Sequence, residues 1–159
     1  MRSGGLTPDP VHERLAQAAR GADLASFGVT YGEDIGRYLN YLEGAVYDPS
    51  ADAIVLERAI GGYVGYQFKP SGVFRVNLAY GLVHEFDNDY TKAAHTLGFD
   101  SGRFGVNRNV QQGHAGFFVT PVKTVDIGLE GIWANRMTLA GEKGEDLRLN
   151  LLTRHYINY

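Results

Sequence analysis

The chain alternates apolar and polar residues over stretches long enough to cross a lipid bilayer, and this feature limits its fold most. The segment 73–84 is the clearest case, since its odd-numbered positions are mostly polar or small and its even-numbered positions are apolar: Phe74, Val76, Leu78, Tyr80 and Leu82. Successive side chains of a β-strand point to opposite sides, so this pattern predicts a strand with one apolar face. The apolar side spans nine positions, which fits the roughly 9 to 11 residues of a tilted transmembrane strand.

Six segments carry this period of two, and we predict strands over 22–31, 59–69, 73–84, 114–120, 124–137 and 146–159. The connections at 69–72 and 121–123 are short, whereas those at 32–50 and 85–113 are long. Alternating short turns and long loops are typical of transmembrane barrels. The predicted fold class is therefore all-β, an antiparallel up-and-down transmembrane β-barrel. About six strands do not close a wide pore, so we expect an incomplete barrel, seen as a curved open sheet with unpaired outer strands.

Residues 1–21 are predicted to be an N-terminal tail or a short helix, because Val11, Leu15 and Ala18 have helical spacing after Asp9 as a cap. Residues 22–159 would then be the C-terminal strands of the barrel. The first 20 residues contain no apolar core of a signal peptide. For an exported protein, we expect that signal to have been lost with a missing N-terminal part, so that the chain is a fragment.

Composition excludes several classes of protein. The formal net charge of -3 lacks the basic excess that nucleic-acid binding requires, so no nucleic-acid partner is expected. The absence of cysteine excludes thiol catalysis, thiolate metal sites and disulfides. No segment approaches the roughly 20 apolar residues of a spanning helix. A barrel remains compatible, because alternating strands are only about half apolar.

If the apolar sides contact lipid, the polar sides line a lumen. The predicted pore-lining residues are Arg75, Asn77, His114, Asp126, Glu130, Arg136, Arg148, Asn150 and Arg154. Aromatic residues near the ends of the apolar sides would form interfacial girdles. These are Tyr31, Phe68, Phe74, Trp133 and Tyr159.

The turns also predict a register for these residues. Pairing Thr120 with Thr124 places His114 opposite Glu130, and pairing Arg136 with Arg148 places Glu130 opposite Arg154. Like charges directly opposite each other destabilise a sheet. The two arginines therefore indicate either water-filled space with anionic solutes, which rings of basic side chains favour, or ion pairs with acidic loop residues. Those residues are Glu142, Glu145 and Asp146.

An enzyme is not predicted. No serine lies in a G-x-S-x-G motif. His114 and Glu130 could act as a base and its orienting carboxylate, as in small outer-membrane hydrolases, or they could form a structural pair. No histidines have metal-motif spacing and no glycines form a phosphate-binding motif, so no metal or cofactor is expected.

Several motifs resemble those of DcaP-like outer-membrane porins, namely TYGEDIGRYL at 30–39, GGYVGYQ at 61–67, VNLAYG at 76–81 and the block 117–156. The matching features of that block are a Pro-Val turn, a Gly-x-Glu strand, an aromatic, arginines, a Gly-rich loop and a terminal aromatic. They correspond to Pro121, Val122, Gly128, Glu130, Trp133, Arg136, Gly141, Gly144, Arg148 and Tyr159. The chain departs from the family's pattern at Glu33-Asp34, where an Asp-Gly pair is expected, and in ending on Tyr159 instead of Phe.

This resemblance implies a trimeric, many-stranded barrel of the Gram-negative outer membrane, with a signal peptide and an N-terminal periplasmic segment. It also implies passive diffusion of small hydrophilic, often anionic, solutes. The front half of such a barrel is absent here. Two alternatives remain open, a small soluble ligand-binding β-barrel and a small complete outer-membrane barrel with a structural or adhesion role. Leu78 and Leu149 distinguish the soluble reading, because they would then meet in a dry interior.

Overall fold

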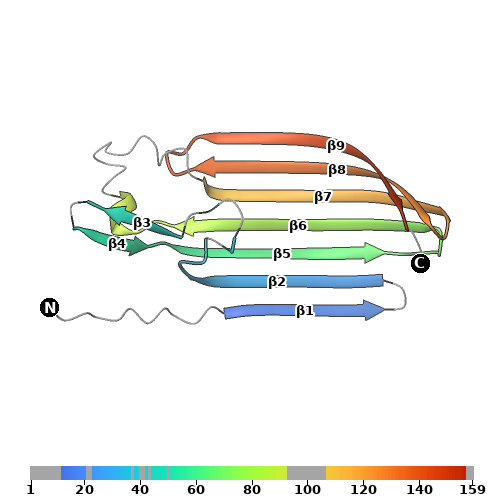
Figure 1. Cartoon of the computed structure of the whole chain (residues 1–159), viewed down its shortest axis with the longest axis horizontal. Coiled ribbons are helices and arrows are strands. Elements are labelled where there is room, and N and C mark those ends of the chain that lie inside the picture. The colour runs from blue at the N-terminus through green and yellow to red at the C-terminus, as the bar shows by residue number, and fades with distance from the viewer. Residues whose placement is uncertain are drawn as a thin grey trace.

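A single antiparallel sheet forms the body of the molecule. The computed structural model describes residues 12–20, 23–36, 38–39, 42, 44–49, 51–92 and 107–156. Seven strands follow one another across the sheet in chain order (Figure 1). They are β1 (His12–Arg20), β2 (Asp23–Glu33), β5 (Arg58–Phe68), β6 (Phe74–Phe86), β7 (Asn107–Val122), β8 (Val125–Thr138) and β9 (Lys143–His155). A separate hairpin consists of β3 (Ala45–Asp48) and β4 (Ala53–Leu56).

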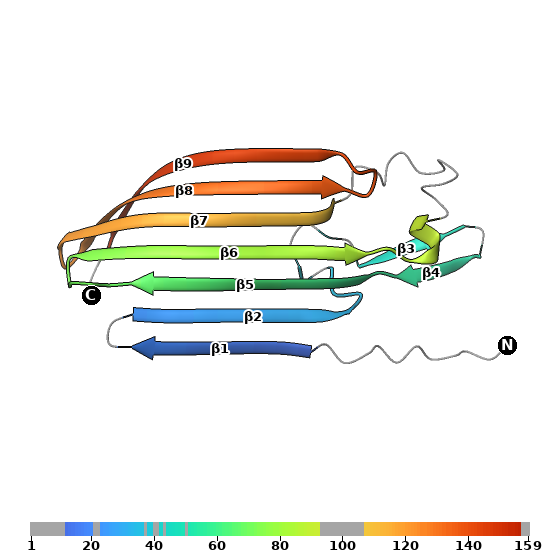
Figure 2. The ribbon, with the colours of Figure 1, turned by 180° about the vertical axis from the view of Figure 1, so that it is seen from behind.

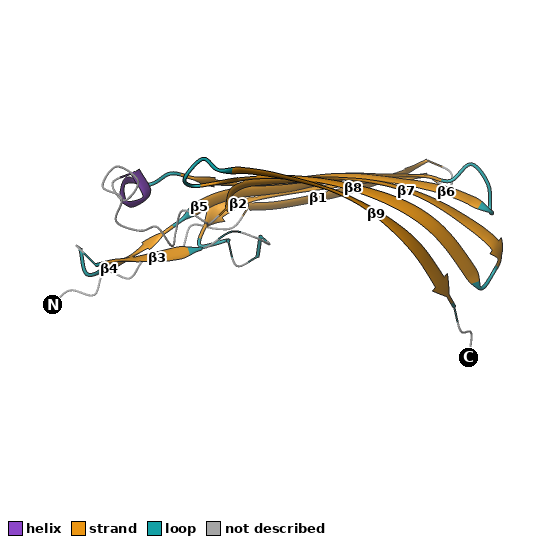
Figure 3. Ribbon diagram, turned by 90° about the horizontal axis from the view of Figure 1, so that it is seen from above, coloured by secondary structure: helices purple, strands orange, loops and turns teal. Residues whose placement is uncertain are grey.

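The sheet is open and curved, as predicted. β1 and β9 form its two edges (Figure 2), and within the described ranges neither has a second strand beside it. The sheet bends along its length, most strongly where β9 ends beside the start of β8 (Figure 3). The all-β antiparallel fold and the open curved sheet are therefore confirmed, with seven strands in the sheet instead of about six.

The expected short helix is wrong for the residues that the structure describes. Residues 12–20 form β1, which pairs with β2 from His12 opposite Tyr31 to Arg20 opposite Asp23. Helical spacing of three apolar residues is a weak preference, and tertiary pairing overrides it when a neighbouring strand can satisfy the backbone hydrogen bonds. Residues 8–11 of the expected helix lie outside the described part of the chain.

Short and long connections lie at opposite ends of the sheet. Residues 69–73 and 123–124 connect strands at one end, here called the short-turn end, where β9 also finishes (Figure 1). Residues 34–57 and 87–106 connect strands at the other, long-loop end. In the described residues, no helix is long and apolar enough to span a membrane.

The segment after β2 identifies the concave face of the sheet. An added Cβ on Gly61 would lie 2.5 Å from Leu39 Cδ2, so the side chain of Leu39 packs directly on that side of β5. Ile35, from the same segment, is 1% exposed. The β3–β4 hairpin that follows lies on the side toward which β8 and β9 curve (Figure 3). The side of the sheet that carries Gly61 is therefore the concave one.

Candidate channel wall

All nine predicted pore-lining residues lie on the concave face. Register places Gly61 in one row with Val83, Val110 and Arg136, and strand alternation assigns the remaining residues to the same face. One row crosses five strands as Gln67, Asn77, Gly116, Glu130 and Asn150. The structure thus gathers these side chains on one surface, and their role in lining a lumen stays a prediction.

The convex face is apolar and uncovered. Leu78 is 48% exposed and Leu149 is 72% exposed. Their neighbours on the convex face are exposed as well, among them Val64, Phe117, Ile127, Leu129, Leu147 and Leu151. No second layer of described residues packs on this face, so the leucines do not meet in a dry interior as they would in a soluble barrel.

The apolar band of the convex face crosses the strands obliquely. Toward the long loops, the last apolar residue of this face is Tyr31 on β2 and Leu147 on β9. The register places Tyr31 in one row with Lys143, which is four residues from Leu147. Four residues correspond to about 14 Å along a strand, and the five strand spacings between β2 and β9 to about 24 Å. The band is thus inclined by about 30°, near the roughly 35–45° tilt of strands in transmembrane barrels.

Two aromatic side chains, Tyr80 and Trp133, share the register row of Leu147, the last apolar residue of β9 on this face. Tyr80 donates its hydroxyl hydrogen to Gln111 Oε1 at 2.8 Å, and the Trp133 indole N–H donates to Glu145 Oε1. Both polar atoms therefore point away from the apolar residues. Of the other predicted girdle residues, Tyr31 packs edge-on against Phe86 at the long-loop end with 6.2 Å between ring centroids. Phe68 and Phe74 flank the short turn between β5 and β6, and Tyr159 lies outside the described residues.

Asp126 organises the concave face at the short-turn end. Its side chain is nearly buried and accepts hydrogen bonds from Thr120 Oγ1 (2.6 Å), the Tyr156 hydroxyl (3.0 Å) and Arg75 Nη2 (3.3 Å). Arg154, directly opposite Asp126, donates from Nη1 to the Tyr156 hydroxyl at 3.3 Å. The network joins β6, β7 and β8 to the residues at the end of β9, which stabilises the last strand of the sheet.

The role of Phe118 was not predicted from the sequence, because attention fell on the apolar residues beside it, which point to the convex face. Its ring lies directly on two glycines. A Cβ added to Gly128 would lie 2.4 Å from the nearest ring atom, and one added to Gly116 would lie 2.8 Å from it. The guanidinium of Arg75 stacks above the ring, 4.6 Å from its centroid. The available signal was a glycine two residues before Phe118 on its own strand and another directly opposite on the next strand, because only a residue without Cβ leaves room for a ring against the backbone.

Polar side chains meet in the middle of the concave face, although the predicted register was wrong. His114 lies opposite Ile132, not Glu130, but its Nδ1 is 3.6 Å from Glu130 Oε1 along the diagonal. Asn150 lies opposite Glu130 and donates to its Oε2 at 3.3 Å, in the place predicted for Arg154. The β7–β8 register is shifted by two residues because the pairing has an irregularity between Val119 and Val122.

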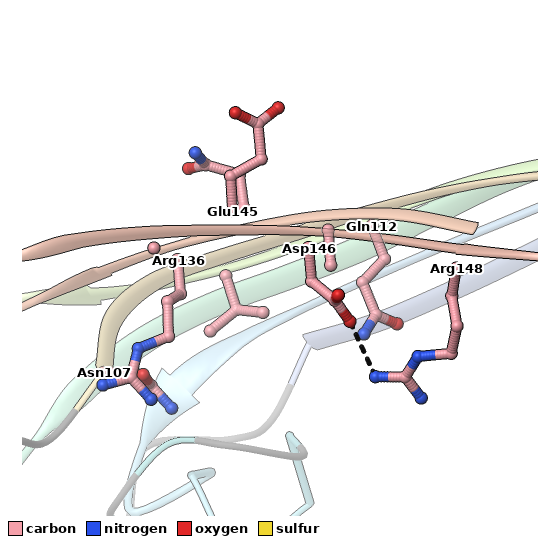
Figure 4. A pocket seen from close by; sticks show the side chains of 10 residues that line it. Asn107, Gln112, Arg136, Glu145, Asp146 and Arg148 are labelled. Atoms are coloured by element: carbon pink, nitrogen blue, oxygen red, sulfur yellow. Dashed lines mark hydrogen bonds and ion pairs between the residues drawn. The ribbon is translucent and has the colours of Figure 1, made fainter.

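Arg136 and Arg148 are not directly opposite each other either. Arg136 pairs with Gly144, and Arg148 pairs with Ile132. The β8–β9 register is thus shifted by four residues from the predicted one, because β9 begins at Lys143 inside the predicted loop. Arg148 Nη2 forms an ion pair with Asp146 Oδ2 at 2.8 Å, which is the acidic alternative considered for it. Arg136 makes no ion pair with any described residue. Both arginines border a recess of about 340 Å³ and point to the same side of the sheet, whereas Glu145 points to the other (Figure 4).

Comparisons with known proteins support the fold. No family model matches the sequence, and a search of curated proteins also finds no match. The structure is similar to that of the outer membrane channel DcaP of Acinetobacter baumannii, with a TM-score of 0.74 and 23% identity over 90% of this chain. The chain spans 40% of the length of that channel. The resemblance drawn from the motifs is thereby confirmed for the fold: the chain is folded like a part of the barrel of a DcaP-type outer-membrane channel.

Proposed function

We propose that this chain forms part of the wall of a water-filled outer-membrane porin, through which small hydrophilic solutes diffuse without covalent chemistry. One observation carries the proposal: the convex face has an uncovered apolar band, and the ion pairs Arg75–Asp126, His114–Glu130 and Arg148–Asp146 lie on the concave face. In a closed barrel the convex face meets lipid and the concave face meets the lumen. The oblique apolar band supports the same orientation.

A preference for anionic solutes is the finer part of the proposal. Arg75, Arg136, Arg148 and Arg154 bring positive charge to the concave face, and basic side chains in a pore favour anions. Acidic partners neutralise Arg75 and Arg148 within the sheet. Arg136 therefore supports the anion preference most directly, because none of the described residues forms an ion pair with it.

The assembled state also belongs to the proposal. We infer a homotrimer in the lipid bilayer of the outer membrane, with residues 22–159 contributing barrel strands. The similarity to a membrane channel supports a membrane location. The trimer rests on the family resemblance.

Neighbouring residues of β9 allow a direct test of the orientation. The chain has no cysteine, so Leu149→Cys and Asn150→Cys each introduce one thiol, on the convex and concave faces respectively. The protein is embedded in vesicles and treated with a charged, water-soluble maleimide. We expect Asn150→Cys to be labelled readily and Leu149→Cys to be labelled only after detergent solubilisation.

A planar-bilayer recording of the same preparation tests transport. We expect stepwise conductance and a reversal potential in a salt gradient that indicates anion preference. Equal labelling of both thiols in vesicles, or vesicle-bound protein without conductance, would contradict the proposed channel wall.

A further inference from the structure

A patch rich in carboxamides lies on the convex face of β7, β8 and β9, next to the apolar band on its long-loop side. Gln111, Asn135 and Glu145 form one row on β7, β8 and β9, and Asn109, Met137 and Lys143 form the next row toward the long loops. On β2, β5 and β6, the first of these rows continues as Val29, Gly62 and Leu82. The patch is therefore confined to the half of the sheet where the oblique band ends early.

The depth of the patch follows from the strand geometry. Its first row lies two residues beyond Trp133 and Leu147, which is about 7 Å along a strand. The polar headgroup layer is about 5–7 Å thick on each side of the hydrocarbon. Since the Tyr80 hydroxyl and the Trp133 indole N–H both point into this row, Gln111 and Asn135 lie at the level of the lipid headgroups.

The chemistry of the patch indicates which headgroup it fits. Phosphate recognition needs cations, and the patch has only Lys143, beside Glu145. Carboxamides carry both donors and acceptors, which match the hydroxyl groups of sugars. Gln111 already uses its Oε1 for Tyr80 and donates weakly to Asn109 at 3.4 Å, while Asn135 makes no hydrogen bond from its side chain to any described residue.

We propose that the convex surface formed by Asn109, Gln111, Asn135 and Trp133 binds the sugar headgroup of a glycolipid. The proposal rests on the membrane orientation proposed above. Asn135 and Gln111 hydrogen-bond the sugar hydroxyls, and the face of Trp133 contacts the apolar side of the sugar ring. The bound lipid lies with its acyl chains along Leu147 and Leu149.

Reconstitution in three kinds of vesicle tests the proposal, made of phosphatidylcholine alone or with an equal addition of a neutral digalactosyl lipid or of phosphatidylglycerol. After detergent extraction and purification, retained lipid is quantified by mass spectrometry. We expect retention of the galactolipid to fall about fivefold in Gln111→Leu/Asn135→Leu, the effect of losing a few neutral hydrogen bonds. Gln112→Leu, the adjacent position on the concave face, retains as much as the unchanged protein.

Trp133 gives a second readout, because it is the only tryptophan in the chain. Iodide quenching of its fluorescence falls about twofold when galactolipid is present. Equal retention of phosphatidylglycerol and galactolipid overturns the proposal, as does equal loss of galactolipid in the Gln111→Leu/Asn135→Leu and Gln112→Leu variants. A protein that inserts and conducts without any galactolipid preference overturns this inference alone, whereas a protein that fails to insert overturns the proposed channel.

Discussion

The two faces of the sheet differ in what holds their side chains in place. On the convex face, Leu78 and Leu149 are exposed and make no stabilising layer with other described residues. On the concave face, Asp126 is bound by three donors and Phe118 lies tightly on two glycines. The concave face is thus stabilised by the chain itself, while the convex face depends on its surroundings. In the proposed channel wall a bilayer supplies those surroundings, because it removes apolar side chains from water.

The largest expected effect is the difference in stability between two variants that place one arginine on the convex or on the concave face. Leu78→Arg should destabilise the protein in vesicles by about 2–4 kcal/mol, the cost of an arginine on the lipid face near the bilayer midplane. Ala79→Arg, one residue along on the concave face, should cost much less. Urea titrations of both variants in vesicles, followed by heat-modifiable gel migration, measure the difference. Equal destabilisation would remove the distinction between the faces.

The network on the concave face should lose about 2 kcal/mol in Asp126→Asn, because buried donors from three residues lose a charged acceptor. The matched variant is Asp146→Asn, which breaks an exposed ion pair with Arg148 on the same face and should cost less than about 1 kcal/mol. Unfolding free energies of the two variants under identical conditions test this. If Asp146→Asn is the more costly, the network does not stabilise the end of β9.

Two glycines of β8 test packing on the two faces. Gly128→Ala puts a methyl group 2.4 Å from Phe118 Cδ1, so the ring must move and we expect a cost of about 1 kcal/mol. Gly131→Ala faces the convex side, with its nearest heavy atom at 4.0 Å, and should be close to neutral. Denaturant midpoints and the near-ultraviolet circular dichroism of the rings report the difference. Identical midpoints would show that Phe118 does not rest on the backbone.

The smallest effect concerns ion selectivity. Arg136→Gln removes a concave-face charge worth about 0.5 kcal/mol at roughly 8 Å in water, so the anion-to-cation permeability ratio should fall about twofold. Arg58→Gln is the control, since Arg58 is paired with Glu33 on the convex face. Reversal potentials in a salt gradient measure both. An unchanged ratio in Arg136→Gln would show that this charge does not contact the permeating ions.

The faces of the strands were predictable from the sequence, and their register was not. Alternation assigned Leu78 and Arg75 to opposite sides because a period of two is a property of each strand alone. Register depends on the turns between strands, and the irregularity at Val122 and the early start of β9 at Lys143 moved His114 and Arg136 away from their predicted partners. His114 still meets Glu130, because diagonal neighbours in a sheet remain within reach of long side chains.

The first part of β7 and the whole of β1 were harder to recognise for different reasons. β7 begins at Asn107 inside a predicted loop, since Asn109 and Gln111 extend beyond the apolar band and interrupt the alternation. β1 becomes a strand through its pairing with β2, which is non-local information. The network around Asp126 likewise combines residues of β6, β7 and β8 with Tyr156, just past β9, so no local sequence pattern predicts it.

The inclination of the strands also orders the polar side chains along the axis of the proposed pore. In a sheet inclined by about 30°, each step to the next strand changes height by about 2.4 Å. Asn77, Glu130 and Asn150 belong to one register row. They would accordingly lie at successive heights along the pore axis instead of in a level ring. A passing solute would exchange hydrogen bonds with them one after another.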